Sequence, residues 1–116
     1  MDYTSNETEP GLTVTTISGA LTRGSKGEEL EWALERLIEG GCRKLILDMS
    51  AVHYIDSAGL GVLVGTTGKM NQAGGKLKLA GVTDKVMMVI KVTKVDQVLS
   101  CETDVQSATK AMGAAA

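Results

Sequence analysis

One stretch of the chain decides how the rest is interpreted: Leu47-Asp48-Met49-Ser50-Ala51-Val52-His53-Tyr54-Ile55-Asp56-Ser57-Ala58-Gly59-Leu60-Gly61-Val62-Leu63. It predicts a buried strand over 44–49, a short loop, and a helix that begins at Ser57 with the serine as its N-cap. A serine in that place is half-exposed in the positive field of a helix N-terminus and can accept a phosphate without strain. The pattern indicates a residue that is modified and recognised, not one that catalyses a reaction.

Composition sets the class of protein. The 116 residues are 43% apolar, enough for a single domain (1–116, core about 12–112) without disulfides or metal. Aromatic residues are only 3%, and Phe is absent, so the core is expected to be aliphatic with methionine. A net charge of −2 with dispersed lysines, among which Lys76 and Lys78 share one face of a predicted strand, argues against a nucleic-acid surface.

The cysteines and the N-terminal segment point to a cytoplasmic protein. Cys42 and Cys101 are far apart and fit neither a disulfide framework nor a metal motif, as expected in a reducing compartment. Residues 1–10 are polar and acidic, which argues against a secretory signal. No apolar run approaches the roughly 20 residues needed to cross a bilayer, so no membrane insertion is expected.

Strand and helix patterns alternate along the chain. Strands are expected at 12–18, 44–49 and 76–80, near 97–100, and as an edge strand at 3–9, with a loop at 19–24. Ser25 and Glu28 have capping-box spacing before a helix that buries one stripe, and Gly40-Gly41 ends it; the stripe is Leu30, Ala33, Leu34, Leu37 and Ile38. This order predicts an α/β fold, with a small, mostly parallel mixed sheet of four to five strands and about four helices.

Three further helices are expected. The helix from Ser57 runs to about residue 73 and is stopped by Gly74-Gly75. Another is capped by Thr83 or Asp84 and buries residues 86, 87 and 90, and the last is capped by Thr103 or Asp104 and buries residues 105, 108 and 112. Gly113 is expected to end the last helix, and residues 114–116 to fray.

The helix after Ser57 is rich in glycine, at a cost of about 1 kcal/mol per interior residue relative to alanine. Gly61, Gly65 and Gly68 share one face, which favours close packing of the backbone against a neighbouring element. Gly59 lies in the first turn, where the missing side chain either allows tight packing or opens Ser57 to a partner.

No constellation supports catalysis. His53 is the only histidine, is expected in a loop, and has no identified acid partner for a triad. Asp48 and Asp56 could form a small acidic cluster, but two carboxylates are weak evidence for a cation. The chain has neither a G-x-x-x-x-G-K-[ST] loop nor a G-x-G-x-x-G fingerprint, so we expect no enzyme, metal or cofactor.

The run from Leu47 to Leu63, with its D-S-x-G-L core at 56–60, resembles the signature of the STAS domain, and is most similar to bacterial anti-sigma factor antagonists. Gly19-Ala20-Leu21 resembles the G-x-L loop of that family, and residues 73–82 resemble the segment after its central helix. The resemblance extends over residues 12–112.

This resemblance implies a mechanism of partner switching. An unphosphorylated antagonist binds an anti-sigma factor that is itself a serine kinase, and thereby releases the sigma factor. The kinase phosphorylates the serine that matches Ser57, the complex dissociates, and a serine phosphatase restores the antagonist. The partner-binding residues implied for this chain are Leu21, Thr22, Asp56, Ser57, Ala58, Gly59, Leu60 and Gly61.

The chain departs from the family pattern in two places. Thr22 stands where the family often has Asp, a difference that bears on coupling to the kinase. Val92-Thr93-Lys94-Val95 replaces a Leu-Thr-Gly-Leu-like stretch, so that Lys94 and nearby Lys91 make this surface more basic and mark a different partner.

Two other functions compete with partner switching. A STAS subunit of a membrane transporter complex, for example in lipid ABC transport, would dock permanently through the same surface and need no modification of Ser57. A nucleotide-binding or nucleotide-hydrolysing protein is the weakest alternative, because the chain lacks a phosphate loop.

Overall fold

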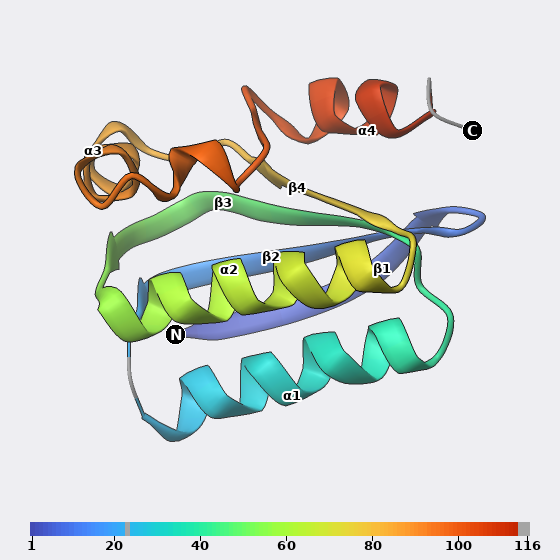
Figure 1. Cartoon of the computed structure of the whole chain (residues 1–116), viewed down its shortest axis with the longest axis horizontal. Coiled ribbons are helices and arrows are strands. Elements are labelled where there is room, and N and C mark those ends of the chain that lie inside the picture. Colours follow the sequence, from blue (N-terminus) through green and yellow to red (C-terminus); the bar gives the residue numbers. More distant parts are fainter. Residues whose placement is uncertain (23, 114–116) are drawn as a thin grey trace.

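The computed structural model describes residues 1–22 and 24–113 and contains a five-stranded mixed sheet (Figure 1). The strands lie in chain order: β1 (Asp2–Glu9), β2 (Leu12–Leu21), β3 (Lys44–Ile55), β4 (Lys76–Ala80) and β5 (Cys101–Glu102). β1 is antiparallel to β2, and every other neighbouring pair is parallel. The expected α/β class and mostly parallel sheet are confirmed.

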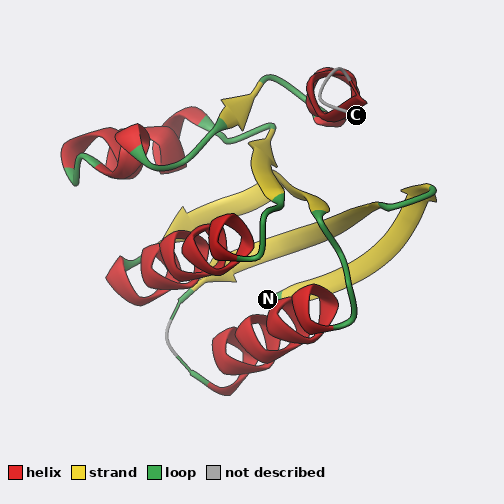
Figure 2. Ribbon diagram, turned by 45° about the vertical axis from the view of Figure 1, so that its right-hand side comes forward, coloured by secondary structure: helices red, strands yellow, loops and turns green. Residues whose placement is uncertain are grey.

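The helices cover both faces of this sheet (Figure 2). They are α1 (Ser25–Glu39), α2 (Ser57–Gln72), α3 (Asp84–Val92) and α4 (Val105–Gly113), with a 3₁₀ turn η1 (Val95–Gln97). Leu45 and Leu47 of β3 belong to the main core with α1 and α2, whereas Ile46 belongs to a smaller core with α4. Both faces of this part of β3 are therefore buried, which explains its nearly continuous apolar run.

Several local predictions are confirmed. β4 has the predicted bounds, and the edge strand is present as β1. Thr83 caps α3, since its side chain accepts a hydrogen bond from the backbone N–H of Val86 at 3.4 Å. Asp104 Oδ1 accepts from the N–H of Ser107 at 2.7 Å before α4, and the hydrogen bonds from Ser107 lower the pKa of Asp104.

The two central strands are longer than predicted. Residues 19–21 and 50–55, both expected as loops, continue β2 and β3 and pair with each other up to Leu21 and Ile55. The apolar pattern weakens in this part of β3 because Ala51, His53 and Tyr54 are exposed. Two irregularities in the β2–β3 register accommodate the extension without ending the pairing.

Three predicted element ends are wrong. α1 begins at Ser25 itself with Gly24 as its N-cap, and the Glu28 N–H donates to the Gly24 carbonyl at 3.1 Å, so the Ser25 capping box is not the helix start. Ser57 is likewise the first residue of α2 and not its cap. The last strand lies at Cys101–Glu102, because η1 occupies part of the segment expected to be extended. The predicted fraying of residues 114–116 lies outside the described residues.

The glycines of α2 have roles opposite to those favoured by their spacing. Gly61, Gly65 and Gly68 are exposed, and a Cβ atom on any of them would have no neighbour within 4 Å, so the predicted packing face is wrong. Gly59 is buried, and a Cβ there would lie 2.2 Å from the Leu21 carbonyl oxygen and 2.9 Å from Ile55 Cγ1. Of the two interpretations of Gly59, tight internal packing is confirmed.

Lys94 is the one non-glycine residue with a positive φ in the part of the chain that the structure describes. Its φ of 63° places it in the left-handed region just after the C-cap of α3, the position where helices favour glycine. A side chain in this conformation costs about 1 kcal/mol.

The packing of α2 predicts opposite effects for two glycine-to-alanine changes. Gly59→Ala forces a methyl group into backbone atoms and is expected to destabilise the fold by about 3 kcal/mol. Gly65→Ala, the matched control, adds a methyl group in open space and is expected to stabilise α2 by about 0.5–1 kcal/mol. Urea unfolding followed by circular dichroism measures both values, and equal effects of the two changes would contradict the assigned packing.

Candidate functional site

The site lies at the edge of the sheet where β2 and β3 end together. The backbone N–H of Asp56 donates to the carbonyl of Leu21 at 3.3 Å, which ties the residue after β3 to the last residue of β2. Because both strands run in the same direction, Thr22 and the Asp56–Ser57 pair emerge side by side at the carboxyl edge, the usual place for functional groups in α/β sheets.

Asp56 orients the first turn of α2. Its side chain accepts a hydrogen bond from the N–H of Gly59 at 2.8 Å, and its carbonyl accepts from the N–H of Leu60 at 2.9 Å. Ser57 follows as the first helical residue and is exposed. Ser57 is therefore exposed, not half-exposed, within the positive field of the helix N-terminus, and Asp56 provides the cap.

The structure separates the predicted partner-binding residues into two groups. Ser57 and Gly61 are exposed, while Thr22, Asp56 and Ala58 are half-buried at the edge. The other three are buried in the core beneath them, where they shape the site from below; they are Leu21, Gly59 and Leu60.

A pocket of about 330 Å³ lies beside Ser57, between the first turns of α1 and α2. The predicted residues Thr22, Ala58 and Gly61 line it together with Gly24, Gly27, Glu28, Glu31 and Val62. The contribution of α1 was missed by sequence reasoning. Gly27, a glycine in the first turn of a helix, was the available signal that α1 packs closely here. A Cβ atom at this position would lie 2.6 Å from the Thr22 carbonyl oxygen.

The predicted acidic cluster does not form. Asp48 lies inside β3, where its Oδ1 accepts hydrogen bonds from the N–H and hydroxyl of Ser50, about 26 Å along the strand from Asp56. Among residues 1–22 and 24–113, no three His, Cys, Asp or Glu side chains gather closely enough to hold a metal ion.

The histidine and the two cysteines do not line this pocket. His53 is exposed on β3, not in the expected loop. Cys42 Sγ donates to the Lys44 carbonyl at 3.4 Å, and burial raises the pKa of the Cys101 thiol, which favours its neutral form. Within the described segments, no helix combines the length and apolar character that crossing a bilayer requires.

Comparison with known proteins agrees with this geometry. The family model described as STAS domain matches residues 3–108. An anti-sigma-B factor antagonist from Staphylococcus aureus is 35% identical over 65 residues, which are 56% of this chain and 60% of that protein. The match thus spans less than two thirds of the relative.

Solved structures share the fold at low sequence identity. The anti-sigma factor antagonist SpoIIAA superposes with a TM-score of 0.81 in its unphosphorylated form (16% identity, 97% of each chain). The phosphorylated form from Bacillus has a TM-score of 0.73 (14% identity, 95% of this chain and 99% of that chain). A sulfate transporter family protein from Wolinella succinogenes has a TM-score of 0.77 (19% identity, 94% and 90% coverage).

The family model covers most of the chain, and the overall fold superposes on these structures. The chain belongs to the STAS domain family.

Proposed function

We propose that this protein is an anti-sigma factor antagonist that binds an anti-sigma factor through the edge around Ser57, and that phosphorylation of Ser57 ends this binding. In this role it regulates sigma-factor-dependent transcription in the cytoplasm, as a binding protein and not as an enzyme. The anti-sigma factor is the serine kinase, and a separate serine phosphatase restores the free hydroxyl.

The observation that carries the proposal is that Ser57 is exposed at the start of α2. The serine lies at the junction of two strand ends and a capped helix, so its position is fixed by the backbone. A kinase can therefore reach the hydroxyl without unfolding the domain.

The modification itself is a phosphoryl transfer from ATP. The Ser57 oxygen forms a bond to the γ-phosphorus, the bond between that phosphorus and the β,γ-bridging oxygen breaks, and ADP leaves. The hydroxyl proton passes to a base of the kinase. The phosphatase reverses the modification by hydrolysis. The oxygen of a water molecule bonds to the phosphorus, the bond between phosphorus and the Ser57 oxygen breaks, and the products are inorganic phosphate and the free serine hydroxyl.

Charge provides the switch. A phosphate adds about −1.5 to −2 charges at Ser57, next to the Asp56 carboxylate and near Glu28 and Glu31 of the adjoining pocket. The helix N-terminus stabilises the phosphate within the domain, whereas a partner packed against this edge meets an increased negative charge. A loss of about 3 kcal/mol at the interface lowers affinity roughly a hundredfold.

The relatives support this proposal. The curated relative is named an anti-sigma-B factor antagonist, and SpoIIAA has been solved in both unphosphorylated and phosphorylated forms. The fold is also shared by a sulfate transporter family protein, so the experiment below includes permanent docking to a transporter as an outcome.

Substitution of Ser57 tests the switch. Incubation with the anti-sigma kinases of the source genome and ATP is expected to phosphorylate the wild type and not Ser57→Ala, because only the wild type offers the hydroxyl. Ser57→Asp is expected to bind the kinase at least about tenfold more weakly, since it adds a negative charge at the interface. Phosphate incorporation and calorimetric titration measure these effects.

Ser50→Ala is the matched control, because Ser50 is exposed on the strand that leads to the site. It is expected to be phosphorylated and bound like the wild type. Tight binding of both Ser57 variants to a transporter ATPase would show constitutive docking instead, and ATP turnover by the isolated domain would show an enzyme.

Phosphorylation is expected to leave the backbone nearly unchanged, because the helix N-terminus and the surface edge accommodate the added group. Amide chemical shifts measured by NMR before and after phosphorylation should change mainly around residues 56–61 and at Thr22. Shifts spread through β4 and α4 would indicate a rearrangement and would contradict a purely electrostatic switch.

A further inference from the structure

The outer face of α3 exposes two large apolar side chains. Met88 is 66% exposed and Val92 is 75% exposed, and their spacing of four residues places them one turn apart. On the opposite face, Val86 and Ile90 are buried in the core. The helix is therefore held to the core by its inner face, and its two outward apolar residues are mostly left in solvent.

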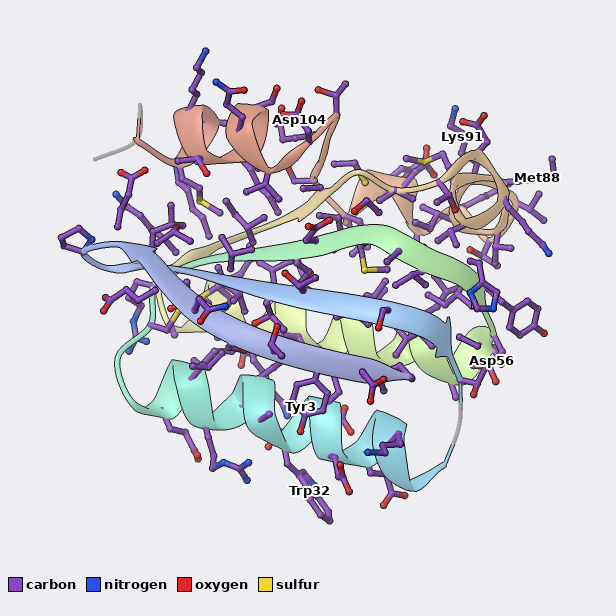
Figure 3. The ribbon with its side chains drawn as sticks, turned by 180° about the vertical axis from the view of Figure 1, so that it is seen from behind. Tyr3, Trp32, Asp56, Met88, Lys91 and Asp104 are labelled. Atoms are coloured by element: carbon purple, nitrogen blue, oxygen red, sulfur yellow. The ribbon has the colours of Figure 1, made fainter. Side chains whose placement is uncertain are left out.

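Three lysines surround these apolar residues. Lys85 and Lys91 lie on α3, Lys94 follows it, and all three are exposed. Figure 3 shows Lys91 and Met88 on the same helix. The ion pairs between described residues involve Lys69 and Lys78, not these lysines. The exposed acidic residues nearest in sequence are Asp84 in the first turn and Asp96 in η1. We call Lys85, Met88, Lys91, Val92 and Lys94 the α3 face.

The backbone at Lys94 adds an independent observation. Its left-handed conformation favours glycine, and the N–H of Lys94 donates to the Lys91 carbonyl at 3.0 Å as the helix ends. Glycine would make this turn most stable. The lysine found there instead places a positive charge beside the apolar residues.

The α3 face adjoins the end of β3 that leads to Ser57. The Thr83 hydroxyl donates to the Val52 carbonyl at 3.4 Å, which anchors the start of α3 to this part of the strand. Tyr54, two residues further along β3, is 47% exposed. Figures 1 and 3 both show α3 and the start of α2 at the same end of the molecule.

We propose that the α3 face is a second part of the interface with the anti-sigma factor, and that it docks an acidic surface carrying an apolar patch. This inference rests on the proposed function. Met88 and Val92 would be covered by the apolar patch, while the lysines would pair with the surrounding carboxylates. An acidic partner also explains the switch, because a phosphate on Ser57 would repel the acidic surface of that partner.

Calorimetric titration with an anti-sigma factor of the source genome that binds the wild type tests the proposal. Met88→Glu is expected to weaken binding about 30-fold, as for a buried anchor residue, and Lys91→Glu about tenfold. Lys91→Glu should also reduce the dependence of affinity on salt. Trp32→Glu is the control, because Trp32 is exposed on α1, away from the α3 face (Figure 3).

Lys94→Gly separates binding from folding. Glycine relieves the left-handed backbone, so Tm is expected to rise by about 4 °C, whereas affinity is expected to fall about fivefold. A purely structural role for Lys94 would leave affinity unchanged or lower Tm.

The possible failures are distinguishable. If Ser57→Asp loses binding while Met88→Glu and Lys94→Gly bind like the wild type, the α3 face is not part of the interface and the switch at Ser57 stands. If no anti-sigma factor of the genome binds the wild type, the proposed function fails and this inference fails with it. Two other results would contradict an acidic protein partner. One is binding of the wild type to phosphatidylglycerol vesicles, and the other is its dimerisation in sedimentation experiments, if Met88→Glu abolishes either effect.

Discussion

The structure depends on one close approach, between the first turn of α2 and the end of β2. The Leu21 carbonyl accepts a hydrogen bond from Asp56, and Gly59 leaves room for the helix to lie directly on this junction. Without that approach, α2 would stand away from the sheet, and its buried residues Leu60 and Leu63 would lose their place in the core. The same approach holds Ser57 at the rim, so core packing and exposure of the hydroxyl have a common origin.

Much of the fold could be predicted because local patterns and tertiary packing agree. The stripe of α1 and the alternation of β4 specify their elements directly. The extension of β3 through residues 50–55 could not be predicted, since this half of the strand exposes His53 and Tyr54 and is held by pairing with β2. Pairing between segments 30 residues or more apart leaves no periodic signal in either segment.

The candidate site was predicted in its centre and not at its boundaries. Ser57 and Asp56 were identified from local sequence, although the predicted cap was Ser57 and the structure has Asp56 as the cap. The pocket residues of α1 and the burial of Gly59 depend on how two helices pack, and the spacing of Gly61, Gly65 and Gly68 suggested the opposite. Glycine spacing defines a face of a helix, but only the neighbouring elements decide whether that face is covered. These three exposed glycines leave α2 dependent on its buried side for stability.

Trp32 is the only tryptophan of the chain and is 55% exposed on α1. Since the indole is already largely hydrated in the folded protein, unfolding changes its surroundings little, and intrinsic fluorescence is a weak reporter of folding. The fluorescence of Trp32 responds instead to any protein that covers α1. Emission and iodide quenching of this single fluorophore therefore offer a label-free means of telling whether a bound protein extends from the rim of the sheet over the outside of that helix.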